Sequence, residues 1–110
     1  MALPLNVYKK LVGIVSTTPQ IIYTAPIGYT AVFLMGQVAN IGATTEEVLF
    51  SYLDLANVVT EIVPNSPVSS NDVIRLIVGK LFVVNGESLQ LSGSSMTNLK
   101  YTFSVLETLN

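Results

Sequence analysis

The sequence offers few side chains that could carry catalytic chemistry. It contains no histidine and no cysteine, so the commonest general base, the thiolate nucleophile and the preferred ligands of transition metals are missing. Ser88, within Gly86-Glu87-Ser88-Leu89, is a nucleophile by residue type only, because a serine nucleophile needs a base beside it. A hairpin turn explains this segment better. We therefore expect no catalytic residue and a protein that is not an enzyme.

The adjacent carboxylates Glu46-Glu47 are a second candidate for acid–base chemistry. Adjacent residues point to opposite faces of a strand and diverge on a helix, so the two carboxylates cannot act on one substrate atom. Calcium binding would need only oxygen ligands, but the sequence has no dense Asp/Asn loop to supply them. We interpret the pair as a solvated turn or edge, and we expect no metal site and no cofactor.

Lysine and tyrosine side chains suit a protein contact instead. On a strand, Lys9 and Lys10 would face opposite sides. This fits one solvated lysine and one edge lysine that prevents unwanted strand pairing. Alternatively they contact an acidic partner, where each exposed ion pair contributes at most about 1 kcal/mol. Tyrosine is enriched at interfaces because its ring buries area while its hydroxyl finds a partner, although each tyrosine could equally lie in the core. The predicted interface residues are Tyr8, Lys9, Lys10, Tyr29, Phe33 and Tyr52.

Composition narrows the class of protein further. The chain has 110 residues, of which 50% are apolar, five are basic and seven are acidic. Its mean hydropathy of +0.59 and net charge of −2 exclude intrinsic disorder. Five scattered Lys and Arg side chains cannot form a phosphate-binding footprint, so we expect no nucleic-acid partner. The length fits a single domain over residues 1–110.

Residues 11–45 carry no charged side chain, which raises the question of a transmembrane helix. Such a helix needs about 20 mainly apolar residues, and turn-forming and polar residues such as Pro19, Pro26 and Gly28 interrupt this stretch. The N-terminus also lacks the basic region that begins a signal peptide. We expect a soluble protein, made in the cytoplasm, with no membrane partner.

The recurring signal along the chain is short β-rich segments separated by turn residues. Residues 99–105 alternate between apolar and polar side chains with a period of two, which predicts a strand with one buried face. Residues 29–40 are apolar on both faces, so this strand should be covered on both sides, in a sandwich or by a partner subunit. One face would hold Tyr29, Ala31, Phe33, Met35 and Gln37, and the other Thr30, Val32, Leu34, Gly36 and Val38. Further strands are expected over residues 5–17, 20–24, 72–78, 81–84 and 88–91.

Three connections have turn chemistry. Pro26 and Gly28 predict a reversal before Tyr29, since proline presets φ and glycine accepts a positive φ. Asn85-Gly86 predicts a two-residue hairpin between the strands at residues 81–84 and 88–91. The segment 64–71, with two prolines and several polar residues, is expected to be a loop.

The segment 46–56 allows two structures. Thr44 and Glu47 have the spacing of a capping box, followed by apolar residues at helical spacing. As a strand, the segment would place Val48, Phe50 and Tyr52 on one face, and Glu47, Leu49, Ser51 and Leu53 on the other. We favour the strand, because the neighbouring segments are strands and an isolated ten-residue helix needs a packed groove.

Two sequence segments and the C-terminal segment resemble those of a known group of proteins. Residues 22–32 are similar to the "-YTAPxGxTAxV-" opening of small virion structural proteins of tailed bacteriophages. Residues 79–89 resemble their "GKxxLxxGDSL" hairpin, with Glu87 in place of Asp and Asn85 before the glycine. Leu99 to Glu107 is similar to their closing "-DVTVSxLE-" strand. The resemblance covers residues 20–107.

This resemblance implies an all-β fold, a single-domain antiparallel β-sandwich of the jelly-roll or Ig-like kind, without enzymatic activity. Residues 1–18 lie outside the resemblance and are a candidate N-terminal arm. We hypothesise a virion protein made in the bacterial host cytoplasm, acting as a capsid cement (decoration) protein. It would form a homo-oligomer, for which we expect a trimer, and contact the major capsid protein or other virion proteins.

Two alternatives to the cement role remain open. The first is a neck, tail or fibre-base protein, which differs from a cement protein in its copy number per particle. The second is a carbohydrate- or receptor-binding β-sandwich module. Such modules usually present exposed aromatic residues, often tryptophan, and this sequence has no tryptophan.

Overall fold

The computed structural model describes residues 6–109, which form nine strands and no helix. No membrane-spanning helix therefore exists in this part of the chain. The all-β prediction is confirmed. The strands are β1 (Asn6–Ile14), β2 (Gln20–Thr24), β3 (Tyr29–Asn40), β4 (Glu46–Leu53), β5 (Val59–Val68), β6 (Val73–Arg75), β7 (Leu81–Val84), β8 (Ser88–Gly93) and β9 (Leu99–Leu109).

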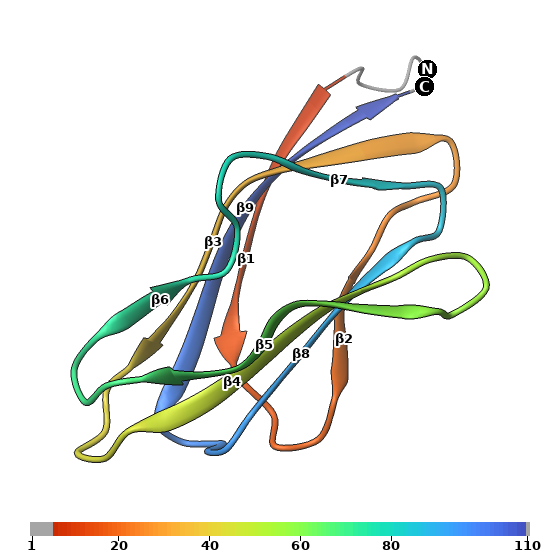
Figure 1. Cartoon of the computed structure of the whole chain (residues 1–110). Coiled ribbons are helices and arrows are strands. Elements are labelled where there is room, and N and C mark those ends of the chain that lie inside the picture. Colours follow the sequence, from red (N-terminus) through yellow and green to blue (C-terminus); the bar gives the residue numbers. More distant parts are fainter. Residues whose placement is uncertain (1–5, 110) are drawn as a thin grey trace.

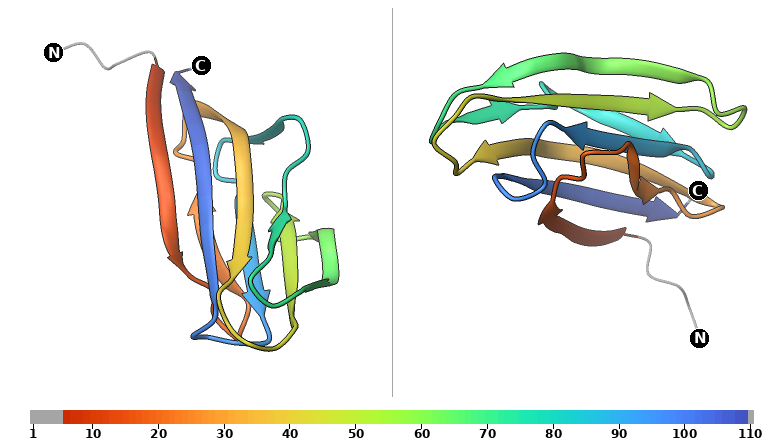
Figure 2. Two further views of the ribbon diagram at one scale, coloured as in Figure 1. Left: turned by 90° about the vertical axis from the view of Figure 1, so that its left-hand side faces the viewer. Right: turned by 90° about the horizontal axis from the view of Figure 1, so that it is seen from below.

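These strands form two antiparallel sheets packed against each other (Figures 1 and 2). Sheet I has the order β1-β9-β3-β6, and β7 also pairs with β3, next to the start of that strand. Sheet II has the order β2-β8-β4-β5. In the left view of Figure 2, β1, β9 and β3 lie side by side. The predicted antiparallel sandwich is thus confirmed.

The connectivity distinguishes between the two predicted kinds of sandwich. β4 pairs with β5, β3 with β6 and β7, β2 with β8, and β1 with β9. The chain is therefore one long hairpin, bent at the β4–β5 connection and rolled so that successive strand pairs alternate between the sheets. This arrangement is a jelly roll.

Aromatic rings from both sheets form the centre of the core. Phe33, Phe50 and Phe103 are all under 2% exposed. The ring of Phe103 in sheet I lies 5.5 Å from Phe50 in sheet II and 5.9 Å from Phe33. Tyr23 of sheet II adds an edge-to-face contact with Phe33 at 5.1 Å. Such ring pairs stabilise beyond their buried area, so these contacts connect the two sheets.

A β-bulge in β3 changes the two faces predicted for residues 29–40. The register against β9 shifts between Phe33 and Met35, which adds one residue and reverses the alternation. Ala31, Phe33, Gly36 and Val38 are consequently all buried. The predicted grouping of Phe33 with Met35, and of Gly36 and Val38 with Leu34, was wrong because the regular period of two ends at this bulge.

The Asn85-Gly86 turn has the predicted backbone but a different role. Asn85 and Gly86 have φ values of 39° and 88°, and the Glu87 N–H donates to the Val84 carbonyl at 3.0 Å. However, β7 pairs with β3 in sheet I, whereas β8 pairs with β2 and β4 in sheet II. The predicted hairpin is wrong, because the core separates the two strands after the turn.

Two further segments test the sequence predictions. Residues 46–53 form β4, so the strand is confirmed, and the Thr44 hydroxyl donates to Glu46 at 3.0 Å in the preceding turn. The loop predicted over residues 64–71 was wrong over most of its length, since β5 continues to Val68. β5 is an edge strand with register shifts against β4, and proline is tolerated at such positions because one side of the strand needs no N–H donors.

The predicted N-terminal arm falls partly on residues 1–5, which lie outside the described residues. From Asn6 onward the chain forms β1, an edge strand that pairs along its whole length with β9. The strand predicted over residues 72–78 is shorter than expected and spans Val73–Arg75.

Candidate functional site: the outward face of sheet I

The register of β1 determines which of its side chains reach the surface. Leu11 packs against the core, and the Gly13 Cα lies beneath the Tyr101 ring, so these residues face inward. Because successive side chains alternate, Lys9 also faces inward, while Tyr8 and Lys10 face outward. Tyr8 is 77% exposed. The two lysines therefore lie on opposite sides of the strand, as predicted.

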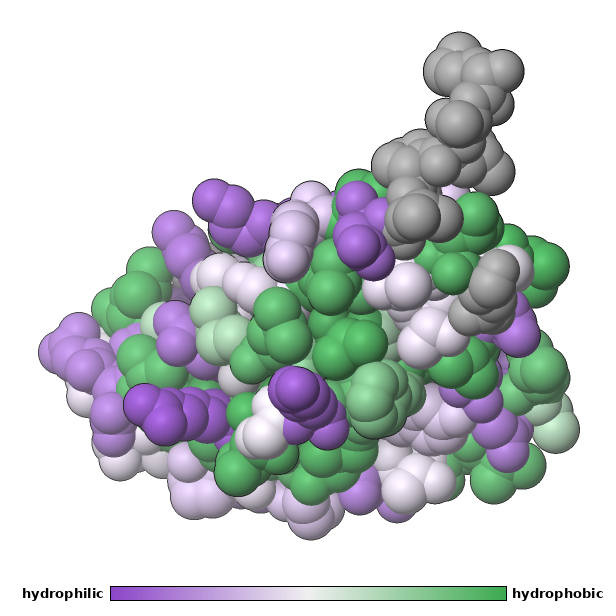
Figure 3. All heavy atoms as spheres, turned by 90° about the horizontal axis from the view of Figure 1, so that it is seen from above, coloured by the Kyte–Doolittle hydropathy of each residue, from purple (hydrophilic) through white to green (hydrophobic). Residues whose placement is uncertain are grey.

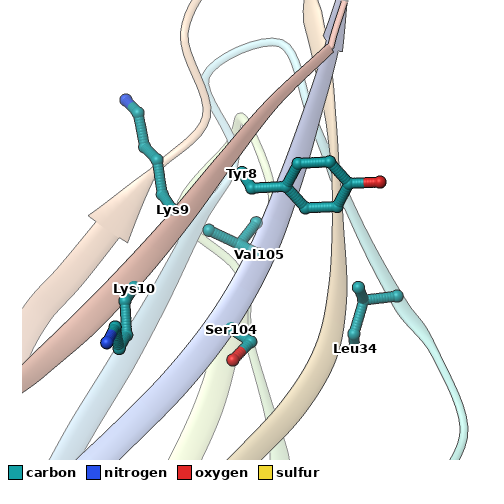
Figure 4. Close-up of a pocket in the computed structure, with 6 residues that line it drawn as sticks. All are labelled: Tyr8, Lys9, Lys10, Leu34, Ser104 and Val105. Atoms are coloured by element: carbon teal, nitrogen blue, oxygen red, sulfur yellow. The ribbon is translucent and has the colours of Figure 1, made fainter.

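A hollow of about 390 Å³ lies on this outward face. It is lined by Tyr8, Lys9, Lys10, Leu34, Ser104 and Val105 (Figure 4). Figure 4 shows the Tyr8 ring extending across β9 toward β3, where Leu34 lies, and Lys9 directed away from them. The hollow thus combines an aromatic ring, an aliphatic side chain and a cation, which suits a protein contact.

A second hollow of about 320 Å³ adjoins the first, and Leu34 lines both. Its other lining residues come from the β3 bulge and from the β6–β7 region: Met35, Gly36, Gln37, Arg75, Ile77, Val78 and Gly79. Leu34, the extra residue of the β3 bulge, lies where the two hollows meet. Together the hollows form a shallow depression from β1 to β6.

Other exposed apolar side chains lie on the same face. Tyr8 and Leu34 line the depression, and Val12, Ile14 and Phe82 are exposed elsewhere on the outward face of sheet I. Figure 3 shows the side of the molecule that is uppermost in Figure 1, where hydrophobic residues also lie at the surface among hydrophilic ones. Groups of exposed apolar side chains mark interaction sites in soluble proteins. The outward face of sheet I is therefore the candidate functional surface.

An ionic cluster around the buried carboxylate of Glu107 supports the same strands from the inward side. Lys9 Nζ lies 3.1 Å from Glu107 Oε1, and Glu107 is only 3% exposed. The Tyr23 hydroxyl of sheet II donates a short hydrogen bond to the same carboxylate. Burial, followed by the hydrogen bond and the charge of Glu107, raises the pKa of Tyr23 well above its usual range. The cluster ties edge strand β1 to both sheets.

The other predicted interface residues are placed away from the depression. Phe33 is fully buried in the core, and its side chain does not reach the surface. Tyr29 is half-buried at the start of β3. Tyr52 packs partly against the core, where a hydrogen bond with Glu87 and burial raise its pKa to about 12. The structure thus brings together Tyr8, Lys9 and Lys10 but not Tyr29, Phe33 or Tyr52.

Sequence reasoning did not select Leu34, Phe82 or Ser104 for this surface. Ser104 was predictable, since it alternates with buried Phe103 and Val105 on β9. To predict that Phe82 lies on this surface, one must know that β7 joins sheet I. To predict it for Leu34, one must know where the bulge lies. No local pattern in the sequence reports either of these.

The residues first considered for catalysis have structural roles. The Ser88 hydroxyl lies 3.1 Å from the Thr24 hydroxyl, on the outward side of sheet II. Glu46 accepts hydrogen bonds from Ser94 at 2.7 Å and from Thr44 at 3.0 Å. These bonds lower the pKa of the Glu46 carboxyl. Residues 6–109 contain no group of three or more acidic side chains arranged to hold a metal ion.

Comparisons with known proteins show a similarity of fold only. No protein-family model matches the sequence, and no curated protein does either. Among solved structures, the chain is similar to a protein of the disulfide-linked pili of Bacillus endospore appendages, with a TM-score of 0.57, 15% identity, and coverage of 99% of this chain and 93% of that one. It is also similar to a chain of the capsid of Helicobacter pylori bacteriophage KHP30, with a TM-score of 0.57, 12% identity, and coverage of 96% and 89%.

Proposed function

We propose that this protein is a non-enzymatic structural subunit of a bacteriophage virion, acting as a capsid cement protein that stabilises contacts between major capsid proteins. The observation that carries the proposal is the outward face of sheet I, where apolar side chains and two adjoining hollows are exposed in the isolated chain. A face of this kind is expected to be covered in an assembly. The similarity to a phage capsid chain is compatible with this role.

The mechanism would be burial of surface and would need no chemistry. Apolar area removed from water stabilises a contact by roughly 25 cal/mol per Å² before the costs of association are subtracted. A contact of about 1,600 Å² repeated over many copies would therefore strengthen a shell. We propose that the subunit acts as a trimer that bridges adjacent capsomers.

The number of copies per particle tests this role. Gel band intensities of purified particles should give hundreds of copies for a cement protein and about a dozen for a neck or tail ring. Cryo-electron microscopy of particles lacking the protein should show weakened or incomplete shells. Intact shells with missing tails would refute the cement role and favour a neck, tail or fibre-base protein.

A bacterial appendage subunit is the second candidate, because the pilus protein is equally similar in fold. The pili of that neighbour are disulfide-linked. This sequence has no cysteine, so this chain cannot form the disulfide links of those pili. Detection of the protein in surface appendages of a bacterium, and its absence from phage particles, would favour this candidate.

A further inference from the structure

The charges of this protein are divided between the two sheets. All five basic residues belong to strands of sheet I or to the β6–β7 connection: Lys9, Lys10, Arg75, Lys80 and Lys100. Five of the seven acidic residues belong to sheet II or to the turns that border it: Glu46, Glu47, Asp54, Glu61 and Glu87. The exceptions are Asp72, just before β6, and Glu107, which is buried. The molecule therefore has a basic side and an acidic side.

Two exposed lysines define a basic pair on the outward face of sheet I. Lys10 lies opposite Ser104 of β9, and Lys100 is four residues away along β9. At about 3.3 Å per residue, the two positions are about 13 Å apart along the strands and one strand apart across them. The only ion pair formed within residues 6–109 is that of Lys9 with Glu107. The lysines of this basic pair therefore have no carboxylate partner in the described chain.

Two exposed glutamates form an acidic pair with the same spacing on sheet II. Glu61 of β5 lies opposite Ser51 of β4, and Glu47 is four residues away from Ser51 along β4. This acidic pair is thus also about 13 Å apart along the strands and one strand apart across them. Glu47 alternates with inward-facing Val48 on β4, and Glu61 lies opposite Ser51, which alternates with inward-facing Phe50. Both glutamates are exposed, so they face outward.

Apolar side chains lie beside or between the two charged residues of each pair. Val12 and Ile14 are exposed on β1, beside the line that joins the two lysines. On sheet II, half-buried Leu49 lies between the two glutamate positions, and Val59 is exposed at the start of β5. Burial of such side chains would supply most of the affinity, while complementary charges would determine the orientation.

The size of the face is also sufficient for a specific contact. Four strand positions about 4.8 Å apart and about 35 Å long give sheet I a flat area of roughly 650 Å². Side chains increase the accessible area above this value, toward the approximately 800 Å² per partner of a standard interface. A symmetric contact of this face with itself would oppose lysine to lysine, and like charges disfavour it.

We propose that the outward face of sheet I docks on the outward face of sheet II of a second copy of this chain, with the basic pair opposite the acidic pair. This inference rests on the proposed function, since it names the contact by which the subunit would self-associate. The contact joins two different surfaces, so it is head to tail. Such contacts close into a ring, such as a trimer, or continue as an open stack, depending on the rotation between copies.

Charge reversal tests this contact on the purified full chain. The double variants K10E/K100E and E47K/E61K each leave two faces of like charge, so each should associate at least tenfold more weakly than the wild type in sedimentation velocity. An equimolar mixture of the two variants should restore the contact, because each face of one variant then meets the opposite charge on the other. The quadruple variant should assemble for the same reason. In the mixture the two variants must alternate, so it should form dimers, even-numbered rings or open stacks, and only the quadruple variant can close a trimer. Lys80→Glu, which reverses a basic residue outside the pair, is the matched control and should assemble normally.

The outcomes separate this inference from the proposed function. All four substituted side chains are exposed, and no side-chain hydrogen bond or ion pair within residues 6–109 involves them, so circular dichroism should report an unchanged fold. Failure of the mixture and of the quadruple variant to assemble would overturn the head-to-tail contact. Loss of assembly in K10E/K100E alone, with E47K/E61K unaffected, would also overturn it. It would indicate that the basic pair contacts a different acidic surface of the second copy. In either case, hundreds of copies per particle would still support the cement role.

Discussion

The two sides of sheet I use the same residue types for different purposes. On the inward side, Lys9 is paired with Glu107, and Phe103 is enclosed by other rings. On the outward side, Lys10 has no carboxylate partner within residues 6–109, and Phe82 is 59% exposed. On the inward side these groups have partners within the chain, whereas on the outward side they are exposed. Residue type therefore says little about role here, and strand register decides it.

The aromatic residues give the largest expected difference between the two sides. Phe103→Ala should reduce the free energy of unfolding by about 3–5 kcal/mol, because it removes contacts with three other rings and leaves a cavity. Phe82→Ala, the matched change on the outward side, should cost about 1 kcal/mol or less. Urea denaturation measures both. Equal losses would show that Phe82 is as enclosed as Phe103, and the contrast between the sides would then be wrong.

The buried carboxylate is expected to have the next largest effect. Glu107→Ala should destabilise the fold by about 2–3 kcal/mol, because the Tyr23 hydroxyl loses its acceptor and Lys9 its counter-charge. Glu107→Gln keeps an acceptor for Tyr23 and should cost less. Exposed Glu61→Ala, measured by the same denaturation, should change stability by no more than about 0.5 kcal/mol. A neutral Glu107→Ala would show that the cluster does not tie β1 to the sheets.

The sequence was sufficient for the elements whose patterns are local. The alternation at residues 99–105 predicted β9, and Pro26 and Gly28 correctly marked the turn between β2 and β3. Gly28 takes the positive φ that its place in the turn requires. In these segments the side-chain pattern and the backbone chemistry agree, and both the strand and the turn can be predicted from a few neighbouring residues.

Features that depend on distant partners were not predictable. The Asn85-Gly86 turn was correct, but the separation of β7 and β8 into different sheets depends on β3, which lies some fifty residues away. The β3 bulge depends on its register with β9. The same holds for the candidate surface: Lys9 and Lys10 were expected on opposite sides, yet nothing local indicated that Glu107 would neutralise only Lys9.

The adjacent lysines provide the most direct test of register as the deciding factor. Lys9→Met should reduce the free energy of unfolding by about 1 kcal/mol, since it leaves buried Glu107 without its counter-charge. Lys10→Met should change stability by no more than about 0.5 kcal/mol. Both changes remove one positive charge and keep a long aliphatic side chain, so each is the control for the other. The opposite order of effects would reverse the assignment of the two sides.

The smallest expected effect is a fall in stability at alkaline pH. The pKa of Tyr52 is raised to about 12 in the folded chain by its hydrogen bond with Glu87 and by burial, whereas an unfolded tyrosine titrates near about 10. Between these values the unfolded state has lost a proton that the folded state retains. The contribution of Tyr52 is therefore fully present below about pH 10 and is lost as the pH rises toward 12. The raised pKa of Tyr23 acts in the same direction.

Denaturation between pH 9 and 11.5 should detect this slope and assign it. Tyr52→Phe removes the titrating hydroxyl, and Glu87→Gln removes the charge that opposes its ionisation, so each variant should have a flatter profile than the wild type. Glutamine keeps an oxygen that can accept the hydrogen bond from the Val84 N–H, which Glu87 accepts at 2.9 Å. The turn before β8 should then remain in place. If both variants kept the full wild-type slope, the alkaline loss would have to come from Tyr23, and Glu107→Gln should flatten the profile instead, because it removes the negative charge beside that hydroxyl.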